Sequence, residues 1–572
     1  MIRWHKVPKQ KKWRRNTMRK LLATLLALAM ILALVPAVMA EGTPELITLT
    51  AFKGASFDQP TEDNKIYKLI EEEFGIKFEW EFLAGNLDET LGLKMADDSS
   101  LPDLFDGGNS AEKLENEGVL IDLMPYITEE GTPNLWKHLH ETNVKLDQLL
   151  TDDGKLYIIP NFGVIYNKEV KRHNGPAFFI QKKVIAWNDY KVPKTLNEYF
   201  DLLERYIAEN PKNEDGLDNI GFHILSKTWR RFCLINPVQH LMGRPNDGEV
   251  IVDINDPGWH TETFINQPYA KPYYAKLNEE YHKGLIIPDS FTMDEDTYIA
   301  DLSRGVVLGM FDQTWAFNTA TQSLLNQGKY EDTYLALPLV YDPEYVDGKV
   351  IEEHYINGTV MNKDRGFGIS INCKYPERVV HLFDELLSDR WQVILHWGIE
   401  GEDWYTDENG RMNMTKEQAD QRNDAAWKRA NMADALYDGI PKKEGTMDNG
   451  NTWDPTQQEE IYYASTLTDY DKEFMKAAGV ESWEDFFNLP IECAPYGEAW
   501  QIDKGPIDED CNTWCLLQEE WLPKVIMADA DKLDDTWNQF IEVITPTSEI
   551  YTNFMQEEVL KLVEKALGNA AK

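Results

Sequence analysis

Two kinds of apolar segment alternate between residues 46 and 105, and this alternation limits the possible folds more than any other feature of the chain. Short runs of β-branched and aromatic residues predict buried strands, and apolar residues at helical spacing predict helices between them. The expected strands are Leu46–Phe52, Ile76–Phe82 and Pro102–Phe105, and the expected helices are Asn64–Phe74 and Leu87–Met95. This order predicts an α/β sheet with helices on its faces.

The middle and the end of the chain are richer in helix. Thr195, with Glu198 three residues later, predicts a capping box at the start of one amphipathic helix. The further expected helices are Leu196–Ala208, Tyr273–Lys283, Val379–Ser388, Asp535–Val543 and Asn553–Ala566. No repeat of roughly 20–50 residues and no low-complexity linker divides the chain. Its 572 residues therefore predict two large lobes with insertions, or about three domain-sized units.

The first 40 residues have the order of a secretory signal. Nine basic residues come first, an apolar run of about fifteen residues over Leu21–Val35 follows, and small residues precede Glu41. The apolar run is shorter than the roughly 20 residues that span a bilayer as a helix. We predict export with cleavage after Ala40, and a membrane anchor is the alternative.

The charge of the chain excludes some partners. Its formal net charge is −41, and loss of the nine basic residues of the signal makes it more negative still. Nucleic acid and anionic membrane surfaces are therefore unfavourable partners. A content of 42% hydrophobic and 12% aromatic residues is too high for a disordered protein.

Common catalytic motifs are absent from the sequence, whereas aromatic residues are abundant. We find no H-E-x-x-H, G-x-S-x-G, phosphate-binding glycine loop or C-x-x-C. The 98 acidic residues could include a glycosidase pair, but sequence does not give the separation that such a pair requires. Eighteen tryptophans and 25 tyrosines suit sugar binding, because aromatic faces stack on pyranose rings while carboxylates and amides bind hydroxyls. The alternative is that most of these tryptophans fill the core.

Six segments in order resemble the family 1 extracellular solute-binding proteins of bacterial ABC-type oligosaccharide importers. The segments are Met95–Phe105 (M-A-D-D-S-S-L-P-D-L-F), Gly118–Leu123 (G-V-L-I-D-L), Asp153–Pro160 (D-G-K-L-Y-I-I-P), Pro193–Tyr199 (P-K-T-L-N-E-Y), Gly305–Trp315 with Gly309-Met310 inside it, and Gly398–Trp404 (G-I-E-G-E-D-W). The resemblance implies a two-lobe, periplasmic-binding-protein-like α/β fold with several interlobe crossings. It also implies that the lobes close on a ligand without chemistry, and that the closed form docks on permease subunits.

The resemblance gives an expected division of the chain. Residues 41–165 and 339–430 would form the N-terminal lobe, and residues 166–338 and 431–572 the C-terminal lobe, which is rich in helix at its end. We expect a monomer that uses no cofactor. Many relatives carry a lipid-anchoring cysteine at the cleavage site, but here Ala40-Glu41 stands there, so a lipid anchor is not supported.

One loop departs from a pattern of the family. Relatives often have an Asp-rich turn that resembles a calcium loop, with glycine at its sixth position. Here Gly216 takes that position, but Pro211 stands at the first ligand position and Phe222 at the twelfth, so the EF-hand pattern is broken. We expect no metal site, and a solvated turn near Asn213–Gly216 is the simplest interpretation.

The resemblance also suggests which residues contact the ligand. Trp315 is the first candidate, because it follows the strand-like run Val306–Phe311 and the family has an aromatic residue on the cleft wall there. Asp106 and Asn109, in the loop after Phe105, would bind hydroxyls, or would instead stabilise their own turn. Further candidate platforms are Trp187, Trp453 and Trp500. A core role is the alternative for each tryptophan.

The leading hypothesis is thus the carbohydrate-binding subunit of an importer, working in the periplasm or at the cell exterior and not as an enzyme. A binding protein for a peptide, a polyol or another polar solute is a second hypothesis, because loops can refit such a scaffold. A secreted enzyme that degrades polysaccharides is a third.

Overall fold

The structure is a computed structural model. It describes residues 45–140, 146–151, 153–161, 163–166, 173, 175–355, 365–491 and 494–570. Within these residues, no helix combines the length and the apolarity that crossing a bilayer requires. The signal predicted over residues 1–40 lies outside the described residues.

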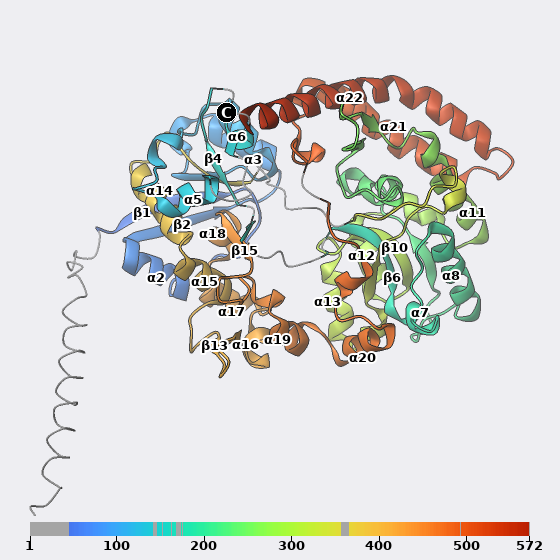
Figure 1. Cartoon of the computed structure of the whole chain (residues 1–572), viewed down its shortest axis with the longest axis horizontal. Helices are drawn as coiled ribbons and strands as arrows, with labels where there is room; N and C mark the ends of the chain where they lie inside the picture. The colour runs from blue at the N-terminus through green and yellow to red at the C-terminus, as the bar shows by residue number, and fades with distance from the viewer. Residues whose placement is uncertain are drawn as a thin grey trace, which may run out of the picture.

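The N-terminal lobe is built on a five-stranded mixed sheet with the order β2-β1-β3-β12-β4 (Figure 1). Its strands are β1 (Ile47–Lys53), β2 (Ile76–Phe82), β3 (Leu104–Asp106), β4 (Ile158–Pro160) and β12 (Gly366–Ile369). The helices of this lobe are α2 (Lys65–Phe74), α3 (Leu87–Met95), α4 (Ala111–Asn116), α5 (Pro133–His140), α6 (Leu146–Leu149), α14 (Pro376–Leu386), α15 (Asp389–Trp397) and α18 (Asp434–Asp438). Because β1 pairs in parallel with both β2 and β3, these three strands end at one edge of the sheet.

The C-terminal lobe is built on a second sheet, with the order β11-β6-β10-β7. Its strands are β6 (Pro176–Gln181), β7 (Ile220–His223), β10 (Val307–Gln313) and β11 (Tyr334–Leu337). Its main helices are α7 (Lys182–Trp187), α8 (Leu196–Glu209), α11 (Lys271–Lys283), α12 (Glu295–Ser303), α13 (Asn318–Asn326), α21 (Asp508–Met527) and α22 (Leu533–Ala570). Strand β10 runs parallel to β7 and antiparallel to β6, so β7 and β10 also end at a common edge.

Several segments cross between the lobes. Strands β5 (Gly163–Tyr166) and β15 (Lys442–Gly445) are not among them; they pair in parallel as a separate two-stranded ribbon beside α15 of the N-terminal lobe, where the Lys443 amide donates to the Gln392 side chain at 2.8 Å. Helix α22 packs on α21 and extends across to α6 of the N-terminal lobe (Figure 1), where the Lys565 ammonium donates to the Leu150 carbonyl at 2.9 Å. The chain from α15 to α20 (Asp469–Ala478) also leads from one lobe to the other.

The fold class predicted from sequence is confirmed, and several local predictions match the structure. Helix α2 starts after Asn64, whose side chain caps it, and ends at Gly75 in the left-handed conformation. The three boundaries at which the sequence divides the lobes stay a prediction. In the described core, Leu339 packs with the C-terminal lobe, and Ile440 packs with the N-terminal lobe.

Two local predictions are wrong. The two terminal helices expected over Asp535–Val543 and Asn553–Ala566 are one helix, α22, which continues through Pro546. Proline removes the hydrogen bond to the Glu542 carbonyl, and the packing of α21 on α22 supports the continuous helix. At the start of α8, Thr195 caps the helix, but the Glu198 carboxylate accepts the Lys194 amide instead of completing the capping box.

Gly309 gives a test of the packing in the C-terminal sheet. A methyl group at this position would overlap the Tyr199 hydroxyl, which donates to the Phe179 carbonyl in the core. We predict that Gly309→Ala lowers the free energy of unfolding by about 1–3 kcal/mol through overpacking. Gly92→Ala is the matched control, because no heavy atom lies within 4 Å of its new methyl group. In α3 it should stabilise the protein by about 0.5–1 kcal/mol, as chemical denaturation would measure. Equal effects of both variants would contradict this packing.

Candidate functional site

Trp315 is exposed and stacks on a second exposed tryptophan. It follows the end of β10, and 56% of its surface is accessible. Its ring lies parallel to that of Trp229, with the ring centroids 5.8 Å apart and an angle of 9° between the planes. Trp229 is 55% exposed, and these two are the exposed members among the described tryptophans. Large aromatic groups are seldom left this open, so the pair is a candidate contact surface.

Each indole is positioned by the end of a strand. Trp315 follows β10, and Trp229 lies in the short helix η4 (Thr228–Arg231), which comes after β7. Since β7 and β10 are parallel, both rings lie beyond the same carboxyl edge of the sheet. Crevices at this edge are where open α/β sheets bind ligands.

A buried cation fixes the base of the indole pair. Arg230 is 1% exposed, and its guanidinium lies 5.0 Å from the centre of the Trp229 ring. It forms ion pairs with Asp312 of β10 at 2.5 Å and with Glu295 of α12 at 2.6 Å. The Tyr298 hydroxyl also donates to Asp312, at 2.9 Å. Arg230 thus joins η4, β10 and α12, so the aromatic surface rests on fixed elements.

Burial affects the charge state of this network. Burial raises the pKa of Asp312 to about 6, while Arg230 and the hydrogen bonds from Gln313 and Tyr298 act in the opposite direction. The carboxyl group is therefore mostly ionised at neutral pH and balances the arginine.

The strand ends of the N-terminal lobe carry charged groups. Lys53 ends β1 and Asp106 ends β3; both are buried, and they form an ion pair. Lys53 also pairs with Asp438 at 2.7 Å, and Asp106 accepts the Gly108 amide at 2.7 Å. Asp106 is thus engaged within its own lobe.

The same cluster reaches the β5–β15 ribbon. Lys442, the first residue of β15, donates to the Asn161 carbonyl at 2.9 Å, and the Asn161 side chain donates to the Asp438 carbonyl. Burial lowers the pKa of Lys442 to about 8, with Asp438 acting in the opposite direction and Lys53 adding to the effect. The strand ends of the N-terminal lobe and the ribbon are therefore linked by polar contacts.

The other predicted site residues lie in different places. Trp187 is half-buried against Tyr206, and the Trp500 indole donates to Glu498 at 2.6 Å. Asn109 lies in the short helix η2 (Gly108–Ser110), and its side chain is outside the described part of the structure. Only Trp315 lies in the exposed indole pair, and the roles predicted for the other residues stay predictions.

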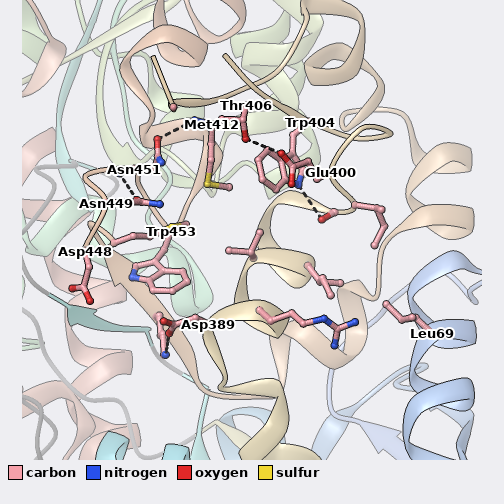
Figure 2. A pocket seen from close by; sticks show the side chains of 18 of the residues that line it. Leu69, Asp389, Glu400, Trp404, Thr406, Met412, Asp448, Asn449, Asn451 and Trp453 are labelled. Carbon is pink, nitrogen blue, oxygen red and sulfur yellow. Dashed lines mark hydrogen bonds and ion pairs between the residues drawn. The ribbon is translucent and has the colours of Figure 1, made fainter. Parts of the chain in front are cut away.

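Trp453 is 4% exposed and lines a pocket away from the indole pair (Figure 2). The pocket lies between α15 and the hairpin of β13 (Tyr405–Thr406) and β14 (Met412–Asn413). In this position Trp453 belongs to one buried apolar cluster with Trp397 and Trp404.

The residue that sequence reasoning missed is Trp229. Its stacking partner is distant in the sequence, so no local pattern joins the two. One signal was available, because Trp229-Arg230-Arg231 comes shortly after the strand-like segment Ile220–His223. An aromatic residue beside basic residues at a strand end is a plausible surface contact.

The loop around Asn213–Gly216, compared above with a calcium site, has side-chain oxygen atoms that bind other groups of the protein. Lys212 pairs with Asp218 at 2.5 Å, and Lys329 pairs with Asp215. The Asn213 side-chain oxygen accepts the Leu217 amide at 3.0 Å. Two carboxylates of the loop thus pair with lysines, and the absence of a calcium site here stays a prediction.

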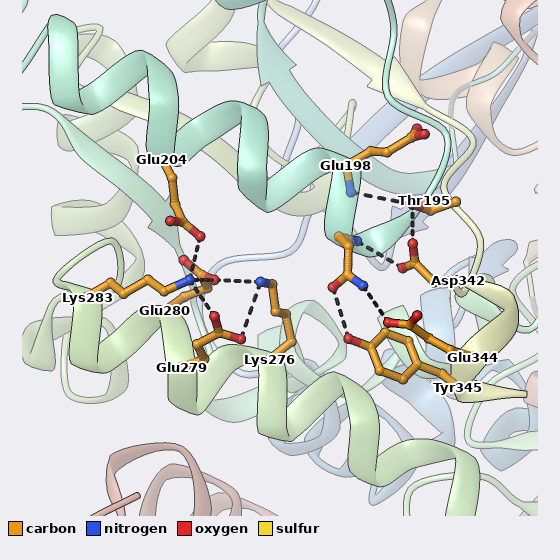
Figure 3. A network of polar contacts seen from close by, with 11 residues as sticks. Thr195, Glu198, Glu204, Lys276, Glu279, Glu280, Lys283, Asp342, Glu344 and Tyr345 are labelled. Carbon is orange, nitrogen blue, oxygen red and sulfur yellow. Dashed lines mark hydrogen bonds and ion pairs between the residues drawn. The ribbon is translucent and has the colours of Figure 1, made fainter.

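A group of three carboxylates elsewhere is also occupied by lysines (Figure 3). Glu204, Glu279 and Glu280 lie close enough together to hold a metal ion. Lys283 pairs with Glu204 at 2.6 Å and with Glu279 at 2.5 Å, while Lys276 pairs with Glu280 at 2.9 Å. These contacts join α8 to α11, so we interpret the group as structural.

Comparison with known proteins shows which solved structures have a similar fold. No family model matches the sequence, and no curated protein matches it. The structure resembles the S. pneumoniae ABC-transporter substrate-binding protein FusA (an EF-hand mutant in complex with fructo-nystose), with a TM-score of 0.60 and 17% identity over 90% of this chain and 99% of that one. It also resembles an extracellular solute-binding protein from Bifidobacterium longum subsp. infantis, with a TM-score of 0.59 and 15% identity over 92% and 99% of the two chains.

A third structure of this kind is the alginate-binding protein AlgQ2 without calcium ion. Its TM-score is 0.57, at 16% identity over 90% of this chain and 98% of that one. The chain therefore has the two-lobe fold of substrate-binding proteins along almost its whole described length. At these identities the likeness establishes the fold and not the ligand.

Replacing the buried Arg230 tests whether it stabilises the elements that carry the indole pair. We predict that Arg230→Met lowers the free energy of unfolding by about 3–5 kcal/mol, because it leaves the Asp312 carboxylate buried without its cation. Arg390→Met is the control, since Arg390 pairs with Glu73 at the surface and is 57% exposed. It should change stability by less than about 1 kcal/mol in the same urea titration. Similar losses for both variants would contradict the supporting role of Arg230.

Proposed function

We propose that this protein is the extracytoplasmic substrate-binding subunit of an ABC transporter and captures an oligosaccharide between its two lobes. The observation that carries the proposal is the parallel, exposed pair of Trp229 and Trp315 at the carboxyl edge of a sheet. The two-lobe fold, shared with the substrate-binding proteins named above, supports it. Export through residues 1–40, release without a lipid anchor and a monomeric state belong to the same proposal.

The aromatic pair would supply most of the affinity. A pyranose ring has flat apolar faces, and stacking on an indole contributes about 1–3 kcal/mol by analogy with base–aromatic stacking. Two parallel indoles on a fixed base offer this surface without reordering, which lowers the entropy lost on binding. Polar groups at the rim would then select among sugars by their hydroxyls.

Capture needs closure, and the crossing segments provide the place for it. Helix α22 connects the lobes, and Lys442 at the start of β15 is joined through Asn161 to Asp438 of the charged cluster. Binding energy would shift the lobes toward a closed form that a permease recognises. No bond in the ligand is made or broken in this scheme, so the protein acts as a carrier and not as an enzyme.

One test of this function removes a ring of the Trp229–Trp315 pair. Trp315→Ala should weaken binding of the native oligosaccharide at least about tenfold, because the loss of one stacked ring removes about 1–3 kcal/mol. Its melting temperature should change by less than about 2 °C, since the side chain is more than half exposed. Isothermal titration and thermal unfolding measure the two effects.

Two further variants sharpen this test. Trp229→Ala should weaken binding to a similar extent, whereas Tyr375→Ala, an exposed aromatic residue of the N-terminal lobe, should not. An unchanged affinity in Trp315→Ala would exclude it as a platform. A collapse of its stability would instead assign it to the core.

Another test distinguishes a carrier from an enzyme. Incubation with a panel of oligosaccharides should raise the melting temperature for a subset of them, because ligands that bind only the folded state stabilise it. Chromatography of the same samples should show the sugars intact. Shorter products would overturn the proposal in favour of a glycoside hydrolase, and stabilisation by peptides or polyols alone would change the ligand class.

A further inference from the structure

A large pocket lies apart from the indole pair and is not used by the proposed function. It has a volume of about 1000 Å³ and is lined by α15, the turn Gly398–Glu400, the β13–β14 hairpin and the loop from Met447 to Trp453 (Figure 2). Leu69 of α2 closes one side. None of its lining residues comes from the sheet of the C-terminal lobe, so a ligand here would not contact Trp229 or Trp315. Its size suits a small organic molecule.

The lining of the pocket is mainly apolar. The apolar residues that line it are Leu69, Val393, Ile394, Ile399, Trp404, Met412, Met447 and Trp453. Trp404 and Trp453 are only 7% and 4% exposed, so neither offers a whole ring face on which a sugar could stack. The two methionines provide a polarisable and adaptable surface. This lining favours an apolar ligand body over a carbohydrate.

Hydrogen bonds hold the walls in place without a ligand. The Trp404 indole donates to the Gly398 carbonyl at 3.1 Å, and the Trp397 indole donates to the Trp453 carbonyl at 2.9 Å. The Met412 amide donates to the Asn451 side chain at 3.0 Å. A ligand would therefore enter a formed site and would lose little free energy in ordering it.

Most charges at the rim are balanced by protein neighbours. Arg390 is held by Glu73, and Lys443 pairs with Asp389 at 2.5 Å while lying over the Trp453 ring. Lys137 and Asp448 add one charge of each sign to the lining.

Glu400 is an exposed acidic group at the rim of the pocket and, like Lys137, has no ion pair among the described residues. Its carboxylate accepts the Thr406 hydroxyl at 2.7 Å. A carboxylate without a cation next to an apolar surface attracts a positive charge. We propose that this pocket binds a small amphipathic cation, whose apolar body fills the lining and whose amine pairs with Glu400.

Two probes with the same indole body and opposite charge test the proposal. Tryptamine carries an ammonium group and indole-3-propionate a carboxylate, and each would be titrated into the full-length protein by calorimetry. Tryptamine should bind at one site, and indole-3-propionate at least about tenfold more weakly, since opposite charge favours the first and like charge opposes the second. Equal affinities, or a preference for the anion, would overturn the proposal.

Variants locate the site and separate it from the sugar platform. Glu400→Gln should weaken tryptamine binding about five- to tenfold, as expected for the loss of one charge-assisted hydrogen bond. Glu408→Gln, in the neighbouring β13–β14 hairpin but outside the pocket lining, should leave it unchanged. Val393→Trp should block binding by filling the cavity, and a thermal melt shows whether that variant is folded. If it is not folded, the two glutamate variants decide the question.

The proposal does not depend on the sugar site. Trp315→Ala should leave tryptamine binding intact even though it removes the proposed sugar platform. Loss of tryptamine binding in Trp315→Ala would show that the probe stacks on the exposed indoles, and the pocket assignment would fail. Equal effects of Glu400→Gln and Glu408→Gln would overturn it as well.

Discussion

The buried ion pairs of Arg230 are the constraint on which the candidate site depends. One guanidinium joins Asp312 of β10 to Glu295 of α12 and lies against the ring of Trp229. A buried cation is tolerated only with partners of opposite charge, so these elements must keep their relative positions. Two tryptophans that would otherwise be mobile surface groups thereby become a fixed aromatic surface at the edge of a sheet.

The two lobes contribute different chemistry to the proposed function. The strand ends of the C-terminal lobe present aromatic rings, whereas those of the N-terminal lobe present the pair of Lys53 and Asp106, which connects through Asp438 and Asn161 to Lys442 of β15. Helix α22 connects the two lobes. A ligand on the aromatic surface would thus act on elements that reach the crossing segments. The pocket beside Trp453 lies outside this chain of contacts.

Local patterns in the sequence predicted much of the fold. The bounds of β2 and α3 match the prediction, because strand and helix periodicity and capping residues act over a few neighbours. The two terminal helices expected from sequence are one helix through Pro546, since packing on α21 supports it in a way that no local pattern shows. The stacking of Trp229 on Trp315 and the burial of Trp453 depend on tertiary contacts, so sequence named Trp315 but not its partner.

The most direct test of the central claim is a crystal structure of the protein with the oligosaccharide that stabilises it most in a thermal screen. The account predicts a sugar ring stacked on the indole of Trp315 or Trp229, with ring atoms about 4 Å from the indole plane, and lobes closer together than in the ligand-free protein. A sugar bound elsewhere, with both indoles still open to solvent, would contradict it.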